Sequence, residues 1–189
     1  VVITSVTRDD LPDGGAGQFA RCVEWVRKLN PETALELLIP DFGGDHDSLD
    51  IVIKSQPEVL AHNVETVPSL YPSIRPQADY KRSLDVLEYT KKTAPDITTK
   101  SSIMVGLGET VDEVRQVFSD LVSVGCNVAT VGQYLPPGPS HPHPEKFYTP
   151  EEFDMLAELG RGEGLEKVFA GPLVRSSYRA HELAGRELK

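Results

Sequence analysis

Cysteine is scarce in this sequence, and long apolar runs are absent from it. The two cysteines, Cys22 and Cys126, lie far apart without a Cys-x-x-Cys spacing, which excludes a disulfide framework and a metal site built from cysteine alone. Apolar runs such as residues 35–39 fall far short of the roughly 20 residues that a membrane-spanning helix needs. We therefore expect a soluble protein from a reducing compartment, with no membrane partner.

Basic residues are also in deficit. The chain of 189 residues carries 29 acidic against 19 basic side chains, a formal net charge of −10. Such a field repels polyanions, so we expect no nucleic-acid partner. The length suits one globular domain. The chain starts inside an apolar run at Val1, with neither methionine nor a signal pattern, and we expect that sequence upstream of Val1 is missing.

Strand-like and helix-like segments alternate along the chain. Short β-branched or apolar runs predict strands at residues 1–6, 35–39, 59–61, 98–105, 127–131 and, more weakly, 167–170. Helical spacing of apolar residues predicts helices at residues 19–29, around 84–87 and at 114–124, and a capping pattern starts another at 149–150. Parallel strands need such long connections, so the fold class is α/β with a parallel sheet.

Common nucleotide and hydrolase motifs are missing. The sequence has no Gly-x-Gly-x-x-Gly, Walker or serine-elbow pattern. The proline-rich stretch 136–144 predicts an extended loop, and its His141 and His143 lack a third ligand at a suitable spacing for a metal.

Polar residues follow most predicted strands at their carboxyl ends, where ligands bind in parallel α/β folds. They are Thr4, Ser5, Asp9 and Asp10, then Asn63 and Glu65, then Gly106, Gly108 and Glu109, then Gln133 and Tyr134. Asn63 and Glu65 point to the same side of an extended strand, so together they could grip the diol of a ribose.

Each of these features has a plainer interpretation. Asp9 and Asp10 could cap a turn, and His62 could be a satisfied core histidine. The glycine pair could form a tight turn. The run 175–178 near the C-terminus could be a solvated tail.

Seven blocks, in the same order, resemble lipoyl synthases, which are radical S-adenosylmethionine enzymes. They are residues 1–16, 40–42, 62–67, 104–110, 132–135, 149–153 and 171–178. The ending Arg175-Ser176-Ser177-Tyr178 is highly specific. The resemblance implies a partial (β/α)6 barrel that lacks its first strand, with a core at 1–170 holding strands two to six and a tail at 171–189.

The resemblance also implies an activity and its partners. A lipoyl synthase inserts two sulfur atoms at carbons 6 and 8 of a protein-bound octanoyl chain. Its cofactors are S-adenosylmethionine and two four-iron four-sulfur clusters, of which the auxiliary one supplies sulfur. The partners would be an octanoylated lipoyl domain or H protein and an electron donor such as ferredoxin or flavodoxin. The location would be the bacterial cytoplasm, or the mitochondrion in a eukaryote.

Site residues follow from the same resemblance. Ser176 would ligate the auxiliary cluster, with Arg175 assisting its release and Ser177 as the alternative ligand. Asn63 and Glu65 would hold the ribose. The remaining cofactor contacts would be Thr4, Ser5, Asp9 and Asp10 at the methionyl end, Lys100 at its carboxylate, Gly106, Gly108 and Glu109 beside the adenine, and Gln133 and Tyr134.

The chain departs from the family in its cysteines. A lipoyl synthase carries a cysteine triplet and a Cys-x-x-x-Cys-x-x-Cys loop, both of which would lie upstream of Val1, and Cys22 and Cys126 match neither. We therefore expect these residues alone to be inactive. Two alternatives stay open: another radical sulfur-inserting enzyme, and a cluster-free module that keeps the nucleoside groove.

Overall fold

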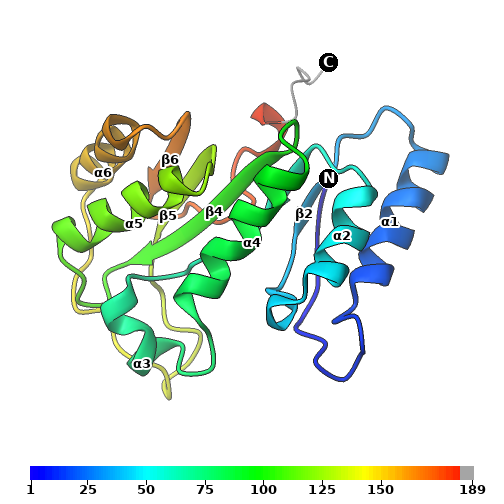
Figure 1. The fold of residues 1–189 in the computed structure, drawn as a ribbon. Helices are drawn as coiled ribbons and strands as arrows, with labels where there is room; N and C mark the ends of the chain where they lie inside the picture. Colours follow the sequence, from blue (N-terminus) through cyan, green and yellow to red (C-terminus); the bar gives the residue numbers. More distant parts are fainter. Residues whose placement is uncertain (184–189) are drawn as a thin grey trace.

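A single parallel sheet organises the protein, whose computed structural model describes residues 1–183 (Figure 1). Its six strands lie in chain order: β1 (Val2–Thr4), β2 (Glu36–Leu38), β3 (Val59–Ala61), β4 (Thr98–Val105), β5 (Val128–Gln133) and β6 (Lys167–Gly171). The helices are α1 (Ala16–Leu29), α2 (His46–Lys54), α3 (Tyr71–Ile74), α4 (Tyr80–Thr93), α5 (Val111–Ser123) and α6 (Pro150–Glu163). Short 3-10 turns are η1 (Phe42–Gly44), η2 (Pro68–Leu70) and η3 (Ala180–Glu182).

The predicted α/β class and partial barrel are confirmed. Every strand runs parallel to its neighbour, and β1 and β6 do not pair with each other within residues 1–183. The weak run near 167–170 also forms a strand, so the core holds six strands rather than five. Residues 184–189 of the predicted tail lie outside the described residues.

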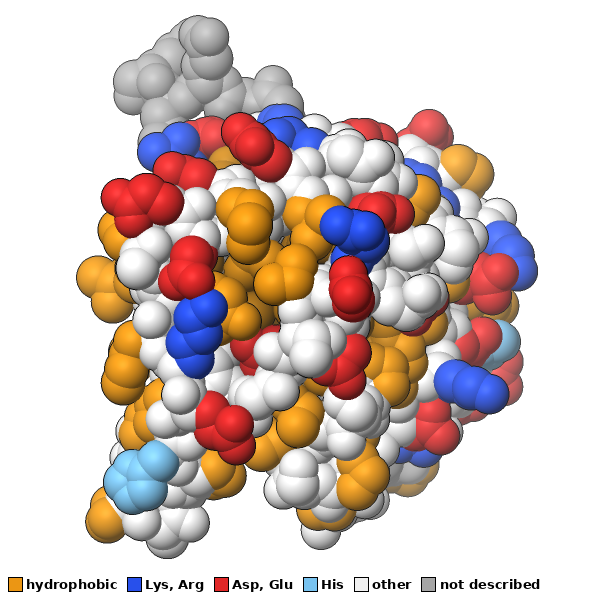
Figure 2. All heavy atoms as spheres, turned by 90° about the vertical axis from the view of Figure 1, so that its left-hand side faces the viewer, with side chains coloured by type: hydrophobic (Ala, Val, Ile, Leu, Met, Phe, Trp, Pro, Cys, Tyr) orange, Lys and Arg blue, Asp and Glu red, His pale blue; other side chains and the backbone are white. Residues whose placement is uncertain are grey.

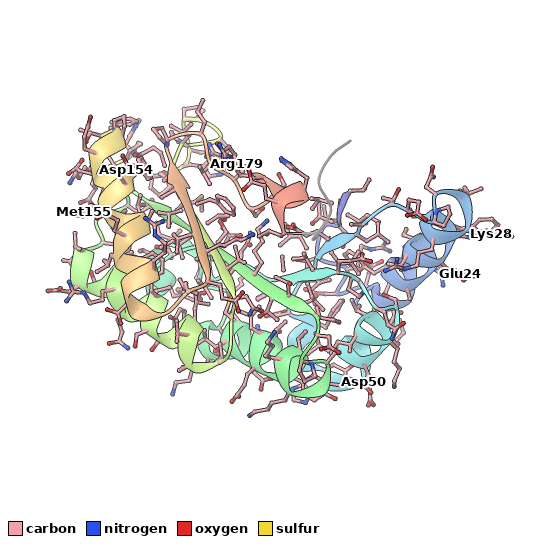
Figure 3. The ribbon with its side chains drawn as sticks, turned by 90° about the horizontal axis from the view of Figure 1, so that it is seen from above. Glu24, Lys28, Asp50, Asp154, Met155 and Arg179 are labelled. Carbon is pink, nitrogen blue, oxygen red and sulfur yellow. The ribbon has the colours of Figure 1, made fainter. Side chains whose placement is uncertain are left out.

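The helices cover one face of the sheet. Figure 3 shows Asp50 of α2 and Arg179 of the tail on opposite sides of the strands. We call the helix-covered side the outer face and the other the inner face. Outward side chains form two apolar clusters, one around Phe118 and Phe153, the other around Leu37 and Leu49. Each fully buried side chain of this size contributes roughly 1.5–3 kcal/mol.

Local signals account for the helix starts. Thr110 with Glu113 and Thr149 with Glu152 both form the capping box that their spacing predicts, in which side chain and backbone bond reciprocally. Helix α2 was not predicted, although Asp45 caps it by accepting from the amide of Ser48. With nine residues it is too short to show a clear period.

Two strands end at other residues than the sequence predicts. Strand β1 pairs only with β2 and ends at Thr4, short of the predicted residue 6. Strand β5 lies between β4 and β6 and extends to Gln133, beyond the predicted residue 131. The extra residues of β5 pair with β4, where Gly132 and Gln133 lie opposite Met104 and Val105.

The inner face contains a buried ion pair. The ammonium of Lys100 in β4 lies 3.0 and 3.1 Å from the two carboxylate oxygens of Glu36 in β2, across the intervening β3. The side chains are 1% and 3% exposed. Burial raises the pKa of Glu36, and the charge of Lys100 opposes that effect. The pair therefore joins strands that do not touch directly.

Among residues 1–183, none of the helices combines the length and the apolar character needed to cross a membrane.

Candidate functional site

Asn63 and Glu65 lie together just past the carboxyl end of β3. The chain continues there beside β4, because the amide of Glu65 donates to the carbonyl of Ser102 and the amide of Met104 donates to the carbonyl of Glu65. The side-chain amide of Asn63 donates to the carboxylate of Glu65 at 3.1 Å. The structure thus brings together the two residues that strand alternation pairs in the sequence.

Glu65 has a strained backbone conformation and a carboxyl with a shifted pKa. Its φ of 67° lies in the left-handed region, which costs a residue other than glycine about 1–3 kcal/mol and is held here by the two backbone bonds to β4. Burial raises the pKa of its carboxyl, while the hydrogen bond from Asn63 and the charge of Arg75 lower it in part. Strain and a perturbed carboxyl at a strand end are typical of a ligand site. Nothing in the sequence around Arg75 indicated that its charge would act on Glu65.

Several buried polar atoms lack a hydrogen-bond partner in the described part of the chain. They are His62 Nε2, Asn63 Oδ1, Thr66 Oγ1 and Thr130 Oγ1. Leaving such an atom unpaired costs about 1–3 kcal/mol, so a bound group that pairs with it stabilises the fold. Asn63 Oδ1 is an acceptor and suits a hydroxyl donor. With the carboxylate of Glu65 beside it, the site has two acceptors side by side, which fit a diol such as that of a ribose.

His62 is only partly the satisfied core histidine of the plainer interpretation. Its Nδ1 lies 2.9 Å from the carbonyl oxygen of Ile39, so this nitrogen carries the hydrogen and Nε2 is the acceptor. Burial lowers the pKa of the imidazole, so the ring is neutral.

Glu109 binds its own turn after β4. Its carboxylate accepts from the amides of Gly106 at 2.7 Å and Leu107 at 2.9 Å, and from the hydroxyl of Tyr148 at 2.9 Å. Gly106 and Gly108 have φ values of 103° and 108°, which only glycine adopts easily. The pair therefore forms a tight turn, and its role beside an adenine stays a prediction.

Gln133 ties the end of β5 to the loop before α6. Its amide nitrogen donates to the carbonyl of Lys146 at 3.0 Å, and its oxygen accepts from the amide of Tyr148 at 3.0 Å. Tyr134 is buried beside it, at 6% exposure. The side chain of Gln133 supports the loop, and a contact of Gln133 or Tyr134 with a cofactor stays a prediction.

The residues after β1 form a more open group. The hydroxyl of Thr4 donates to a carbonyl of β2 at 3.0 Å. Asp10 forms an exposed ion pair with Arg8, which lowers the pKa of this carboxyl. Ser5 and Asp9 are exposed. These side chains follow β1 as predicted, and they are accessible to a ligand.

Lys100 is the predicted residue that the structure does not bring to the strand ends. It is the third residue of β4, is 1% exposed and is ion-paired with Glu36. To bind the carboxylate of a ligand, as predicted, the ammonium of Lys100 would have to exchange its ion pair with Glu36 for that carboxylate.

The chain after β6 crosses the inner face. Val174 is buried at 5% exposure, and the guanidinium of Arg175 donates to the carbonyl of Val174 at 2.7 Å. Ser176 is half-buried and Ser177 is exposed. Val174 therefore anchors the segment just before the run 175–178, whereas Arg175, Ser177 and Tyr178 within that run are exposed, as the plainer interpretation expects.

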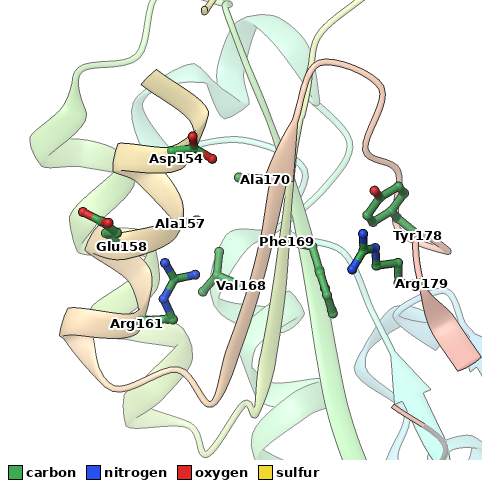
Figure 4. A pocket seen from close by; sticks show the side chains of 9 residues that line it. All are labelled: Asp154, Ala157, Glu158, Arg161, Val168, Phe169, Ala170, Tyr178 and Arg179. Carbon is green, nitrogen blue, oxygen red and sulfur yellow. The ribbon is translucent and has the colours of Figure 1, made fainter. Parts of the chain in front are cut away.

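Two further contacts hold the tail against β6. The rings of Phe169 and Tyr178 meet edge-on, with centroids 6.1 Å apart, and the ammonium of Lys167 donates to the carbonyl of Glu182 at 3.1 Å. Figure 4 shows Phe169, Tyr178 and Arg179 on one side of β6 and the α6 residues on the other.

A shallow hollow of about 350 Å³ lies at the β6 edge. Figure 2 shows the face that carries α6, where charged side chains surround hydrophobic ones. The hollow is lined by Asp154, Ala157, Glu158, Arg161, Val168, Phe169, Ala170, Tyr178 and Arg179. Its two carboxylates and two guanidinium groups balance in charge, and it contains none of the predicted site residues.

The cysteines do not fit an iron–sulfur cluster. Cys126 is buried, its thiol lies within hydrogen-bonding distance of the carbonyls of Thr99 and Val128, and burial raises its pKa to about 12. A cluster needs thiolates. Cys22 lies on α1, and residues 1–183 contain no group of three or more His, Cys, Asp or Glu that could hold a metal.

Curated relatives are just over 50% identical to this chain along nearly its whole length. The lipoyl synthase of Caldicellulosiruptor saccharolyticus is 52% identical over 182 residues, which cover 96% of this chain and 64% of the relative. The lipoyl synthase of Trichlorobacter lovleyi is 53% identical over 184 residues, covering 97% and 65%. The chain therefore spans just under two thirds of the length of these relatives.

A solved structure and a family model agree with the fold. The crystal structure of methylornithine synthase (PylB) superposes with a TM-score of 0.63 at 14% identity, covering 99% of this chain and 63% of that one. The model of the radical SAM superfamily matches residues 1–121, which include β1 to β4 and the Asn63–Glu65 pair. This match extends over more than half of the sequence, and the chain belongs to the radical SAM superfamily.

Proposed function

We propose that the protein is a lipoyl synthase, a sulfurtransferase that inserts two sulfur atoms at carbons 6 and 8 of a protein-bound octanoyl chain. The observation that carries this proposal is the likeness to lipoyl synthases at 52% identity over nearly the whole chain, which includes the Asn63–Glu65 pair. S-adenosylmethionine supplies radical chemistry when bound, as the unactivated carbons of an octanoyl chain require.

The residues at the strand ends would bind and orient S-adenosylmethionine. Asn63 Oδ1 and the carboxylate of Glu65 accept from the two ribose hydroxyls, and the bond between them fixes both side chains. We assign the methionyl end to Thr4, Ser5, Asp9 and Asp10, and the adenine to the turn with Gly106, Gly108 and Glu109. The side-chain amide of Gln133 and the backbone amide of Tyr134 both donate to the carbonyl of Val105, just before this turn.

Two four-iron four-sulfur clusters are proposed as further cofactors. Since Cys22 and Cys126 do not fit them, the cysteine ligands would not come from these 189 residues. Ser176 would be the one ligand that this chain supplies, with Arg175 beside it and Ser177 as the alternative. The proposed partners are an octanoylated lipoyl domain or H protein and a ferredoxin or flavodoxin, in the cytoplasm of a bacterium.

Complementation tests the activity. Expression of the full reading frame that contains these 189 residues should restore growth without lipoate to a bacterial strain that lacks lipoyl synthase, whereas the 189 residues alone should not. Ser176→Ala should lower the amount of lipoylated protein by roughly 100-fold or more, because loss of a ligand disables the metal centre. The matched variant Ser177→Ala should produce as much lipoylated protein as the unsubstituted gene. Failure of the unsubstituted gene, despite soluble protein, would refute the proposal.

A cluster-free nucleoside-binding module is the second candidate. It is favoured by the misfit of the two cysteines beside an intact Asn63–Glu65 pair. It predicts no complementation, together with binding of adenosine to purified protein, which calorimetry would measure.

A further inference from the structure

Two glycines lie side by side near the carboxyl ends of β5 and β6. Gly132 in β5 and Gly171 in β6 are partners in the parallel register. Both lie on the inner face, because the preceding residues, Val131 and Ala170, pack against the outer apolar cluster. We call this pair the glycine seat.

Val174 lies directly on the glycine seat. A Cβ built on Gly132 would meet the carbonyl oxygen of Val174 well inside the 3.0 Å that real Cβ atoms essentially never cross. The same Cβ would lie 3.2 Å from Nη1 of Arg175. A Cβ on Gly171 would lie 3.2 Å from Cγ2 of Val174.

Space explains these glycines, and backbone conformation does not. Neither Gly132 nor Gly171 has a positive φ, so an alanine could adopt the backbone of either residue. The two differ in what blocks the side chain. At Gly132 the obstacle is the backbone of the tail, which moves only if the tail moves. At Gly171 it is a methyl group, which can yield by a small rotation.

We propose that Gly132 is a positioning residue, which with Gly171 forms a seat that fixes where the tail crosses the sheet. Ser176 follows Val174 by two residues, so its position over the inner face depends on this crossing. The contact of Tyr178 with Phe169 and the bond from Lys167 to Glu182 hold the tail further along. The seat is inferred from the close approach of Val174 to Gly132 and Gly171. Its importance for catalysis rests on the proposed function.

Three glycine-to-alanine variants test the seat. Gly132→Ala should speed amide hydrogen exchange at Val174 and Tyr178, whose amides are hydrogen-bonded within the tail, by roughly ten-fold or more, because overpacking displaces the tail. Gly171→Ala should speed it only a few-fold. Gly162→Ala is the matched control, since no atom lies within 4 Å of its Cβ, and it should leave exchange unchanged. Trypsin cleavage after Arg175 and Arg179 should rise in the same order.

Exchange in α5 separates displacement of the tail from general unfolding. If Gly132→Ala leaves both tail exchange and α5 at the rate of the unsubstituted protein, the proposal is overturned. If Gly132→Ala also unfolds α5, Gly171→Ala decides: faster exchange confined to the tail supports the seat, and an unchanged tail overturns it. These readouts need no cofactor, so they stand whether or not Ser176→Ala abolishes lipoylation.

Discussion

Replacing Lys100 with methionine is expected to lower the free energy of unfolding by about 3–5 kcal/mol. Methionine fills a similar volume, but it leaves the carboxyl of Glu36 buried at 3% exposure without its cation. The free energy of unfolding falls because the unpaired carboxylate of Glu36 cannot be hydrated by water. Urea unfolding of the purified protein, followed by circular dichroism, measures the loss.

Two matched variants identify the cause of that loss. Lys92→Met breaks an exposed pair with Glu88 and should change stability by less than about 1 kcal/mol. The double variant Glu36→Leu with Lys100→Met removes both charges and should recover most of the loss.

The pH dependence of stability gives a further check. The pKa of Glu36 is raised in the folded state, so its carboxyl gains a proton as the pH falls, and the loss of stability caused by Lys100→Met should become smaller. A single variant as stable as the unsubstituted protein would contradict the ion-pair argument.

Glu65→Gln is expected to stabilise the protein while weakening its proposed function. Glutamine keeps the left-handed backbone but removes the cost of burying a charged carboxyl, and a gain on the order of 1 kcal/mol is typical of such stabilising substitutions. The same change removes a charged acceptor from the ribose, and such a hydrogen bond is worth about 1.5–3 kcal/mol. We therefore expect the KM for S-adenosylmethionine to rise roughly 10- to 100-fold.

The pH dependence of stability checks the first half of that expectation. Because the folded pKa of Glu65 is raised, the folded state binds its proton more tightly than the unfolded chain does. The advantage of Glu65→Gln should be greatest above the folded pKa and should decline as the pH falls through it. Glu88→Gln, on the surface of α4, should change neither stability nor KM appreciably. An unchanged KM for Glu65→Gln would remove Glu65 from the site.

Local rules were sufficient for all six strands and the longer helices, and for one part of the site. Strand β4 runs from Thr98 to Val105 as its β-branched pattern predicts, and both capping boxes form between residues three apart. Such features depend on neighbours within a few positions, so a sequence reveals them directly. Asn63 and Glu65 meet as predicted, but β3 ends at Ala61 and Glu65 has a left-handed backbone, so the bonds of Glu65 to β4 hold it there rather than strand alternation. The resemblance to lipoyl synthases added the family, which the comparisons confirm at the level of the radical SAM superfamily.

Tertiary structure decided the contacts that join distant segments. Lys100 meets Glu36 across 64 positions, and nothing near either residue indicates the other. Gly132 and Gly171 become a seat only once β5 and β6 pair and the tail returns over them. Sequence by itself determined the alternation of strands and helices and predicted that Asn63 and Glu65 meet. The register of the sheet decided which charges are buried and where Ser176 lies, because those depend on which strands become neighbours.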